Sequence, residues 1–141
     1  MVVKDYMQAL TLTVAPYDLL STARRLMSDL LIRHLPVVRE GNCLVGILTD
    51  RDLRQASPSR GAGVIDHELQ ETFNAMTVSE VMTQPVYTVS PDTALVEAAI
   101  LLLDHKFDCL PVVDDGGALQ GLITTSDFVR VYVEQHENVM F

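Results

Sequence analysis

The chain contains one pattern twice: residues 3–54 return as residues 78–129 at a constant offset of 75, without a gap. Most matched positions are apolar or turn-forming, as two copies of one packing unit would share. Examples are Val3/Val78, Val14/Val89, Leu35/Leu110, Pro36/Pro111 and Gly46/Gly121. The repeat is too long for one turn of a solenoid, and two copies are too few for an array. The duplication therefore predicts two half-domains packed about a pseudo-twofold axis.

Each copy has the pattern strand, helix, strand, strand, helix, which predicts an α+β fold of two β-α-β-β-α repeats. Apolar residues at helical spacing indicate a helix with a broad buried face, and β-branched runs on both sides of Glu40-Gly41-Asn42 indicate a hairpin. The first copy is expected to have strands at 12–14, 35–38 and 43–48 and helices at 19–31 and 49–56. The second copy is expected to have strands at 87–89, 110–113 and 119–123 and helices at 93–105 and 126–135.

The repeats set the expected domain organisation. The first repeat covers 1–56, an inter-repeat linker covers 57–77, and the second repeat covers 78–141. The linker begins with a loop over 57–63, which is rich in Ser, Pro and Gly. Asp66 is expected to cap a short helix whose Leu69, Phe73 and Met76 share one face. This helix is expected to pack against the repeats and not to form a third domain.

Composition predicts a protein that folds unaided in the cytoplasm. With 141 residues and 48% hydrophobic content, the chain can bury one sizeable core. Residues 1–10 contain no apolar segment typical of a signal peptide, and no apolar run approaches the ~20 residues that a membrane span requires. Cys43 and Cys109 lie at non-equivalent positions without ligand spacing, so we expect reduced thiols and no metal site.

Charge is distributed unevenly between the two halves. Residues 1–70 hold eight basic and eight acidic residues, whereas residues 71–141 hold two basic and eleven acidic residues and thus the whole net charge of −9. Direct binding to nucleic acid requires a basic surface, so this class of partner is not expected. The acidic second half should also hold an anionic ligand less readily than the first.

In both copies the last strand ends in a Gly-x-x-Thr-x-x-Asp segment, at residues 46–52 and 121–127. A Thr hydroxyl and free backbone N–H groups at a helix N-terminus attract anions such as phosphate. A carboxylate one turn later can accept both hydroxyls of a ribose. The same spacing is also a capping box, in which Thr and Asp satisfy the backbone donors of their own helix. Two matched instances favour a ligand site, and both interpretations stay open at this point.

The chain resembles a tandem pair of cystathionine-β-synthase (CBS) domains, also called a Bateman module. The resemblance covers nearly the whole chain. It rests on the Val-x-[Asp/Glu]-x-Met openings at 3–7 and 78–82, the two Leu-Pro-Val-Val strands and both Gly-x-x-Thr-x-x-Asp segments. The inter-repeat segment is similar to that of stand-alone bacterial members related to acetoin-utilisation proteins.

The resemblance implies two clefts between the repeats that bind AMP, ADP, ATP, S-adenosylmethionine or a related adenosine ligand. The ribose would be held by Asp52 or Asp127 and the phosphate by Thr49 or Thr124. The base would pack against the first strand and the residues around Leu-Pro-Val-Val. These residues are Thr13, Val14, His34 and Pro36 in one cleft, and Thr88, Val89, Cys109 and Pro111 in the other. A homodimer built from helical faces is also implied.

The two clefts are expected to differ in charge. The first motif is accompanied by Arg33, His34, Arg51 and Arg54, whereas the matched positions of the second copy hold Asp108, Cys109, Ser126 and Val129. Since Arg51 could hold a phosphate with a bidentate fork, the first cleft is expected to prefer a phosphorylated ligand. The alternatives are a solvated Arg51, a half-buried structural His34 and a packed, unreactive Cys109.

Together these patterns predict a non-enzymatic regulatory module, with an adenine nucleotide as its regulatory ligand and no obligatory cofactor. Binding would shift the module between two states and signal to an effector protein, as in energy sensing. The alternative is a structural or interaction protein that dimerises through its repeats while its clefts are empty or degenerate. An enzyme is not expected, because the sequence has no Ser-His-Asp arrangement and no Gly-Lys-[Ser/Thr] loop.

Overall fold

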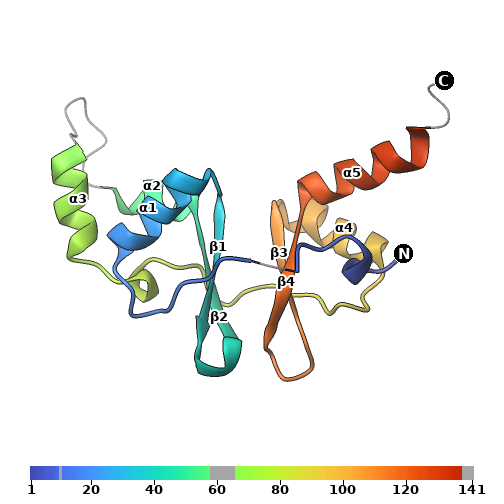
Figure 1. Ribbon diagram of the computed structural model, residues 1–141, viewed down its shortest axis with the longest axis horizontal. Helices are drawn as coiled ribbons and strands as arrows, with labels where there is room; N and C mark the ends of the chain where they lie inside the picture. Colours follow the sequence, from blue (N-terminus) through green and yellow to red (C-terminus); the bar gives the residue numbers. More distant parts are fainter. Residues whose placement is uncertain (10, 58–65, 138–141) are drawn as a thin grey trace. The chain divides into compact units, whose positions relative to one another are not determined.

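The computed structural model describes residues 1–9, 11–57 and 66–137, so most of the predicted linker loop lies outside the described residues. The chain divides into two compact units, each built around one antiparallel hairpin (Figure 1). The central unit is Leu12–Val86, and the terminal unit combines Met1–Thr11 with Tyr87–Phe141. The predicted α+β class, with two repeats that each contain a small sheet, is confirmed.

The secondary structure follows the predicted order. The central unit contains α1 (Leu20–Leu30), β1 (His34–Arg39), β2 (Cys43–Thr49), α2 (Asp50–Ala56) and α3 (Asp66–Asn74). The terminal unit contains α4 (Leu95–His105), β3 (Cys109–Val113), β4 (Leu119–Thr124) and α5 (Thr125–His136). Short 3₁₀ turns lie at Val3–Asp5 and Val78–Glu80. None of the helices among the described residues has both the length and the apolar character of a membrane span.

The strands predicted at 12–14 and 87–89 are shorter than expected. Each is a single parallel bridge, Val14 to Val37 and Val89 to Val112. The Val14 N–H donates to the Pro36 carbonyl at 3.1 Å, and Val14 in turn accepts from Val38 N–H at 2.9 Å. A proline follows two residues later in both copies and diverts the chain from the sheet, so the ladder ends after one residue.

The third strand of each sheet comes from the opening segment of the other repeat. Gln8, which precedes the first repeat's helices, exchanges two backbone hydrogen bonds with Leu122 of β4, at 2.8 and 3.0 Å. Thr83 makes the matching pair with Ile47 of β2, at 2.8 and 3.1 Å. A side chain on Gly121 would collide with the Gln8 backbone, so this close approach requires glycine. The compact units are therefore not the same as the sequential repeats, and the boundaries 1–56, 57–77 and 78–141 stay a prediction about the duplication.

The two hydrophobic cores correspond position by position. Eight buried residues of one core match eight of the other at the offset of 75, and only Phe73 and Val131 differ. The matched pairs are Val3/Val78, Val14/Val89, Leu20/Leu95, Ala23/Ala98, Met27/Leu102, Leu35/Leu110, Val37/Val112 and Leu48/Ile123. Val3 belongs to the core of the terminal unit and Val78 to that of the central unit, so the exchange of opening segments includes the core.

The inter-repeat helix α3 completes the central core. Phe73 is 1% exposed within this core, and Leu69 and Met76 pack against it. The predicted helix with one apolar face is thus present and begins at Asp66, although the capping role of the Asp66 side chain lies outside the described residues. Figure 1 shows α3 beside α1 in the same unit.

Replacing Phe73 with Ala should destabilise the protein by ~3–5 kcal/mol, because a fully buried aromatic ring leaves a cavity that the core cannot refill. Urea unfolding measures this loss. Glu68→Ala on the same helix is the control, since Glu68 is exposed and a surface substitution should change stability by no more than about 0.5 kcal/mol. Equal effects of the two substitutions would contradict the packing of α3 into the core.

Candidate functional site

Both Gly-x-x-Thr-x-x-Asp segments form the junction between a strand and a helix. Thr49 ends β2 and caps α2, and Thr124 ends β4 and caps α5. One backbone bond fixes each junction against the residue that precedes the hairpin: Asp50 N–H donates to the Arg33 carbonyl at 3.1 Å. In the terminal unit, Thr125 N–H donates to the Asp108 backbone carbonyl at 3.0 Å. The same local sequence therefore produces the same junction twice.

In the central unit, Thr49 and Asp52 form a complete capping box. Thr49 N–H donates to Asp52 Oδ2 at 2.9 Å, and Asp52 N–H donates to Thr49 Oγ1 at 3.1 Å. The Asp52 carboxylate also accepts from the Thr83 hydroxyl, at 3.0 Å to Oδ1 and 3.1 Å to Oδ2. Capping is thus one role of these residues. The Asp52 carboxylate remains half-buried, and its partner outside the capping box is the neutral hydroxyl of Thr83.

The other residues predicted for the first site adjoin this junction in the same unit. His34 lies opposite Thr49 in the hairpin register, and the backbones of Val14 and Pro36 are hydrogen-bonded. Val14 and Pro36 are buried, whereas Thr13 and His34 are half-buried. Val14 and Pro36 can therefore offer a ligand only apolar contact, and polar contacts must come from Thr13 and His34.

Basic side chains are exposed at the central junction. Arg51 and Arg33 are exposed, and Arg54 lies 3.9 Å from Asp50 in an ion pair between two largely exposed side chains. Such a pair contributes only about 0.3–0.5 kcal/mol, so it does not hold Arg54 firmly. The junction offers guanidinium groups without burying any of them.

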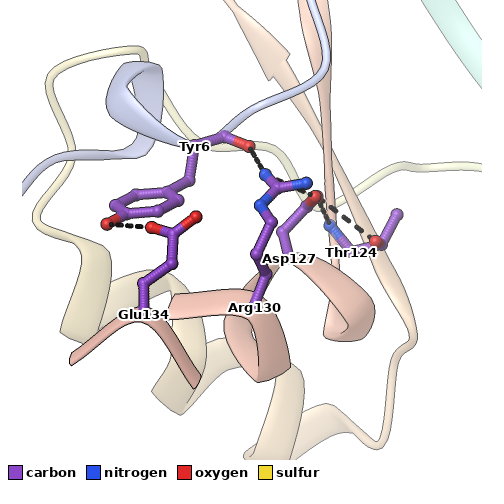
Figure 2. Close-up of polar contacts among 5 residues, drawn as sticks. All are labelled: Tyr6, Thr124, Asp127, Arg130 and Glu134. Atoms are coloured by element: carbon purple, nitrogen blue, oxygen red, sulfur yellow. Dashed lines mark hydrogen bonds and ion pairs between the residues drawn. The ribbon is translucent and has the colours of Figure 1, made fainter. Parts of the chain in front are cut away.

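In the terminal unit the carboxylate is enclosed. Asp127 is 1% exposed, accepts from Thr124 N–H at 2.8 Å and from the Thr124 hydroxyl at 3.2 Å, and forms an ion pair with Arg130 at 3.2 Å (Figure 2). Arg130 is three residues further along α5. Asp127 is buried whereas half of the Arg130 side chain is exposed, so solvent and salt screen this ion pair less than a pair at the surface but more than a fully buried one.

Arg130 links Asp127 to the opening segment of the chain. It donates to the Tyr6 carbonyl at 3.0 Å, and the Tyr6 hydroxyl donates to Glu134 Oε2 at 3.1 Å (Figure 2). The hydrogen bond to Glu134 raises the pKa of Tyr6, with smaller contributions from desolvation and from the charges of Glu134 and Asp5, which Arg130 opposes.

Sequence reasoning missed Arg130, Tyr6, Glu134 and Thr83. The comparison with Arg51 and Arg54 considered only matched positions, and Arg130, which forms an ion pair with Asp127, has no basic counterpart in the first repeat. One signal was available: Arg130 is one of two basic residues in 71–141 and lies three residues past Asp127 on the same helix. The Tyr6 contact spans 124 residues and has no local signal.

The remaining residues of the predicted second site are mostly buried. Val89 N–H donates to the Pro111 carbonyl at 3.1 Å, and Cys109 lies opposite Thr124 in the register. Val89, Cys109 and Pro111 are buried, and only Thr88 is exposed. Burial, then the charges of Asp127 and Asp108, raise the pKa of the Cys109 thiol to about 12. The thiol is therefore protonated at neutral pH, as the interpretation of Cys109 as a packed residue requires.

A cavity of about 580 Å³ lies elsewhere in the terminal unit. Its lining includes Thr88 and Val89 together with Thr93, Glu97 and Ile100 of the α4 region, but neither Thr124 nor Asp127. This cavity therefore contains Thr88 and Val89 of the predicted second site, but not its Thr-x-x-Asp motif. Within the described parts of the chain, no group of three or more His, Cys, Asp and Glu side chains could hold a metal ion.

Comparison with known proteins identifies relatives of the whole chain. The CBS domain family matches residues 3–59 and 78–134. A Vibrio cholerae protein, provisionally named an acetoin utilization protein, has a solved structure with a TM-score of 0.80 and 35% identity, covering 97% of this chain and 93% of that one. CBSX2 of Arabidopsis thaliana, solved in complex with AMP, has a TM-score of 0.79 and 32% identity, covering 94% and 96%.

Some curated relatives are much longer enzymes. A homoserine O-acetyltransferase of Methanococcoides burtonii is 32% identical over 129 residues, which are 92% of this chain but 24% of that protein. The chain thus spans about a quarter of this relative, and the similarity carries no information about the remaining three quarters.

Cys109 should react with iodoacetamide far more slowly than Cys43 at pH 8, because the thiolate is the nucleophile and Cys109 is buried with a raised pKa, whereas Cys43 is exposed. Peptide mass spectrometry after a timed pulse measures both thiols in one sample. In urea the two rates should converge. Equal labelling of the native protein would contradict the enclosed environment of Cys109.

Proposed function

Because the chain belongs to the CBS domain family, we propose that it is a non-enzymatic regulatory module that binds an adenosine-type ligand and signals its occupancy to an effector protein. The observation that carries the proposal is the half-buried carboxylate of Asp52, held at a strand-to-helix junction beside Thr49 and the basic Arg51. A ligand of the AMP or ATP type would make the module an energy sensor.

The geometry around Asp52 suits a ribose. Outside the capping box, Asp52 accepts from the hydroxyl of Thr83, which lies within hydrogen-bond distance of both carboxylate oxygens. A ribose diol offers the same kind of neutral O–H donor, so it can take over this position without a net loss of hydrogen bonds. The base would then pack near Thr13 and His34, which are half-buried next to the junction.

Arg51 and Thr49 would hold the phosphate. Arg51 is exposed and follows Thr49 by two residues, and a guanidinium binds phosphate through two parallel charge-assisted hydrogen bonds. The similar structure that contains AMP supports a phosphorylated adenosine ligand for this chain. Residues 12–86 of the central unit hold seven basic and nine acidic residues, whereas the terminal unit holds three basic and ten acidic residues, so the central unit is the better site for such an anion.

A second candidate is a structural or interaction protein without a bound ligand. It is favoured by the completed hydrogen bonding of both carboxylates, since Asp52 and Asp127 already have protein donors. It is also favoured by exposed apolar side chains of α4 and α5, which suit a homodimer: Val96, Ile100, Leu103, Val129, Tyr132 and Val133.

A thermal-shift series with AMP, ATP and adenosine separates the candidates. A ligand at a hundred times its Kd adds about 2.7 kcal/mol to stability and raises Tm, whereas a protein with empty clefts shows no change.

Asp52→Ala should abolish binding of adenosine and AMP in the central unit, because the ribose acceptor is lost. The fold should survive with a capping loss of ~1 kcal/mol. Isothermal titration calorimetry measures binding and urea unfolding measures stability. Asp50→Ala is the matched control, since it removes an equal charge from the same helix but only a weak ion pair with Arg54. Undiminished binding by Asp52→Ala would leave capping as the sole role of this residue.

Arg51→Ala should weaken AMP binding by roughly ten- to a hundredfold, the equivalent of one charge-assisted hydrogen bond. Adenosine, which has no phosphate, should bind the variant and the parent alike. Arg54→Ala controls for the loss of one positive charge at the same junction. Parallel calorimetric titrations with the two ligands give the comparison, and equal losses for adenosine and AMP would refute a phosphate contact by Arg51.

A further inference from the structure

Besides the Thr of its own motif, the Asp carboxylate of each copy has a different partner. Asp52 accepts from the neutral hydroxyl of Thr83, at 3.0 and 3.1 Å. Asp127 is paired at 3.2 Å with the guanidinium of Arg130, and its other oxygen already accepts from Thr124 (Figure 2). The position that matches Arg130 in the first repeat is Gln55, which is exposed.

We propose that Arg130 is an internal competitor for Asp127 and thereby determines the selectivity between the two units. With Arg130 in place, the terminal unit binds a neutral, ribose-bearing ligand more weakly than the central unit does. This inference rests on the proposed function, because it concerns the same type of ligand at the second copy of the motif.

The competition follows from the chemistry of the donors. A ribose hydroxyl that donates to the carboxylate is a neutral donor, whereas Arg130 joins its positive charge to the negative charge of Asp127, so a ribose that displaces Arg130 must offset the lost Coulomb attraction of the pair. The displacement of Thr83 from Asp52, in contrast, exchanges one hydroxyl for another. Asp127 is 1% exposed, its Oδ2 accepts from Thr124 and its Oδ1 is paired with Arg130, so a ribose hydroxyl must displace Arg130 to bind Oδ1.

The contacts of Arg130 still allow its side chain to move. Its second contact is the Tyr6 carbonyl at 3.0 Å, and Tyr6 is held in turn by Glu134. Half of the Arg130 side chain is exposed, so it can turn toward solvent without unpacking the core. Departure of Arg130 would also release the Tyr6 carbonyl, so occupancy of the terminal site would loosen the attachment of residues 1–8 to α5.

The test uses adenosine as the probe, since its lack of charge keeps phosphate electrostatics out of the comparison. Asp52→Ala first removes the carboxylate of the central unit, and Arg130→Gln is then added to reproduce the residue of the first repeat. We expect adenosine to bind the double variant about tenfold or more tightly than Asp52→Ala alone, by calorimetry, because the charged competitor is gone. Unchanged or weaker binding by a folded double variant would overturn the proposal.

A substitution at the matched position of the first repeat keeps the test decisive if Arg130→Gln misfolds. Arg130→Gln leaves a buried carboxylate without its cation, so circular dichroism and the thermal transition must show that the variant is folded. Gln55→Arg, placed on the exposed face of α2 in the parent, carries no such risk and should weaken adenosine binding at Asp52 several-fold. Gln55→Lys is the charge-matched control, because a lysine cannot form the same fork. If Arg130→Gln does not fold, this arm alone decides: binding unaffected by Gln55→Arg would overturn the proposal.

The two levels of failure are distinguishable. If adenosine and AMP bind neither the parent nor any variant, the proposed function itself is wrong, and the inference falls with it. If the parent binds adenosine through Asp52 and neither Arg130→Gln nor Gln55→Arg changes affinity in the expected direction, only the role of Arg130 is refuted.

Discussion

The structure depends on two short backbone ladders that join the opening segment of each repeat to the hairpin of the other. A two-stranded hairpin alone is marginally stable in water, and each hairpin here gains its third strand at Gln8–Leu122 or Thr83–Ile47. The same exchange delivers Val3 and Val78 to opposite cores. Neither repeat is therefore a complete packing unit by itself.

The candidate ligand residues also hold the exchanged segments. In the central unit, Thr83 of the incoming strand binds the Asp52 carboxylate directly, whereas in the terminal unit Tyr6 is reached from Asp127 through Arg130. A ligand that takes over either carboxylate must replace a contact that anchors the segment. Under the proposed function, occupancy and attachment of the segment would be linked directly through the Asp52 carboxylate in the central unit and through Arg130 in the terminal unit. A regulatory module requires such differential stabilisation of two states.

The two copies of the motif differ in the residues that contact their carboxylates and not in the motif residues themselves. Thr and Asp are present in both copies, and in both the Asp side chain accepts from the backbone N–H of the Thr that precedes the helix. The difference lies in a neutral hydroxyl beside Asp52 and a guanidinium beside Asp127, and in the surplus of acidic residues beyond residue 70. A duplicated scaffold can therefore hold two sites of unequal affinity while the packing core of both stays nearly unchanged.

The sequence by itself determined the hairpins, the helices, the two matched cores and the caps of α2 and α5, because periodicity and i to i+3 contacts are local. It also placed Phe73 on the apolar face of α3. The tertiary structure decided which hairpin each opening segment joins, since Gln8 could pair with either copy of a duplicated strand. It also decided the burial of Asp127 and the contact between Arg130 and Tyr6, 124 residues apart. These depend on long-range packing, for which a repeated sequence contains no unique signal.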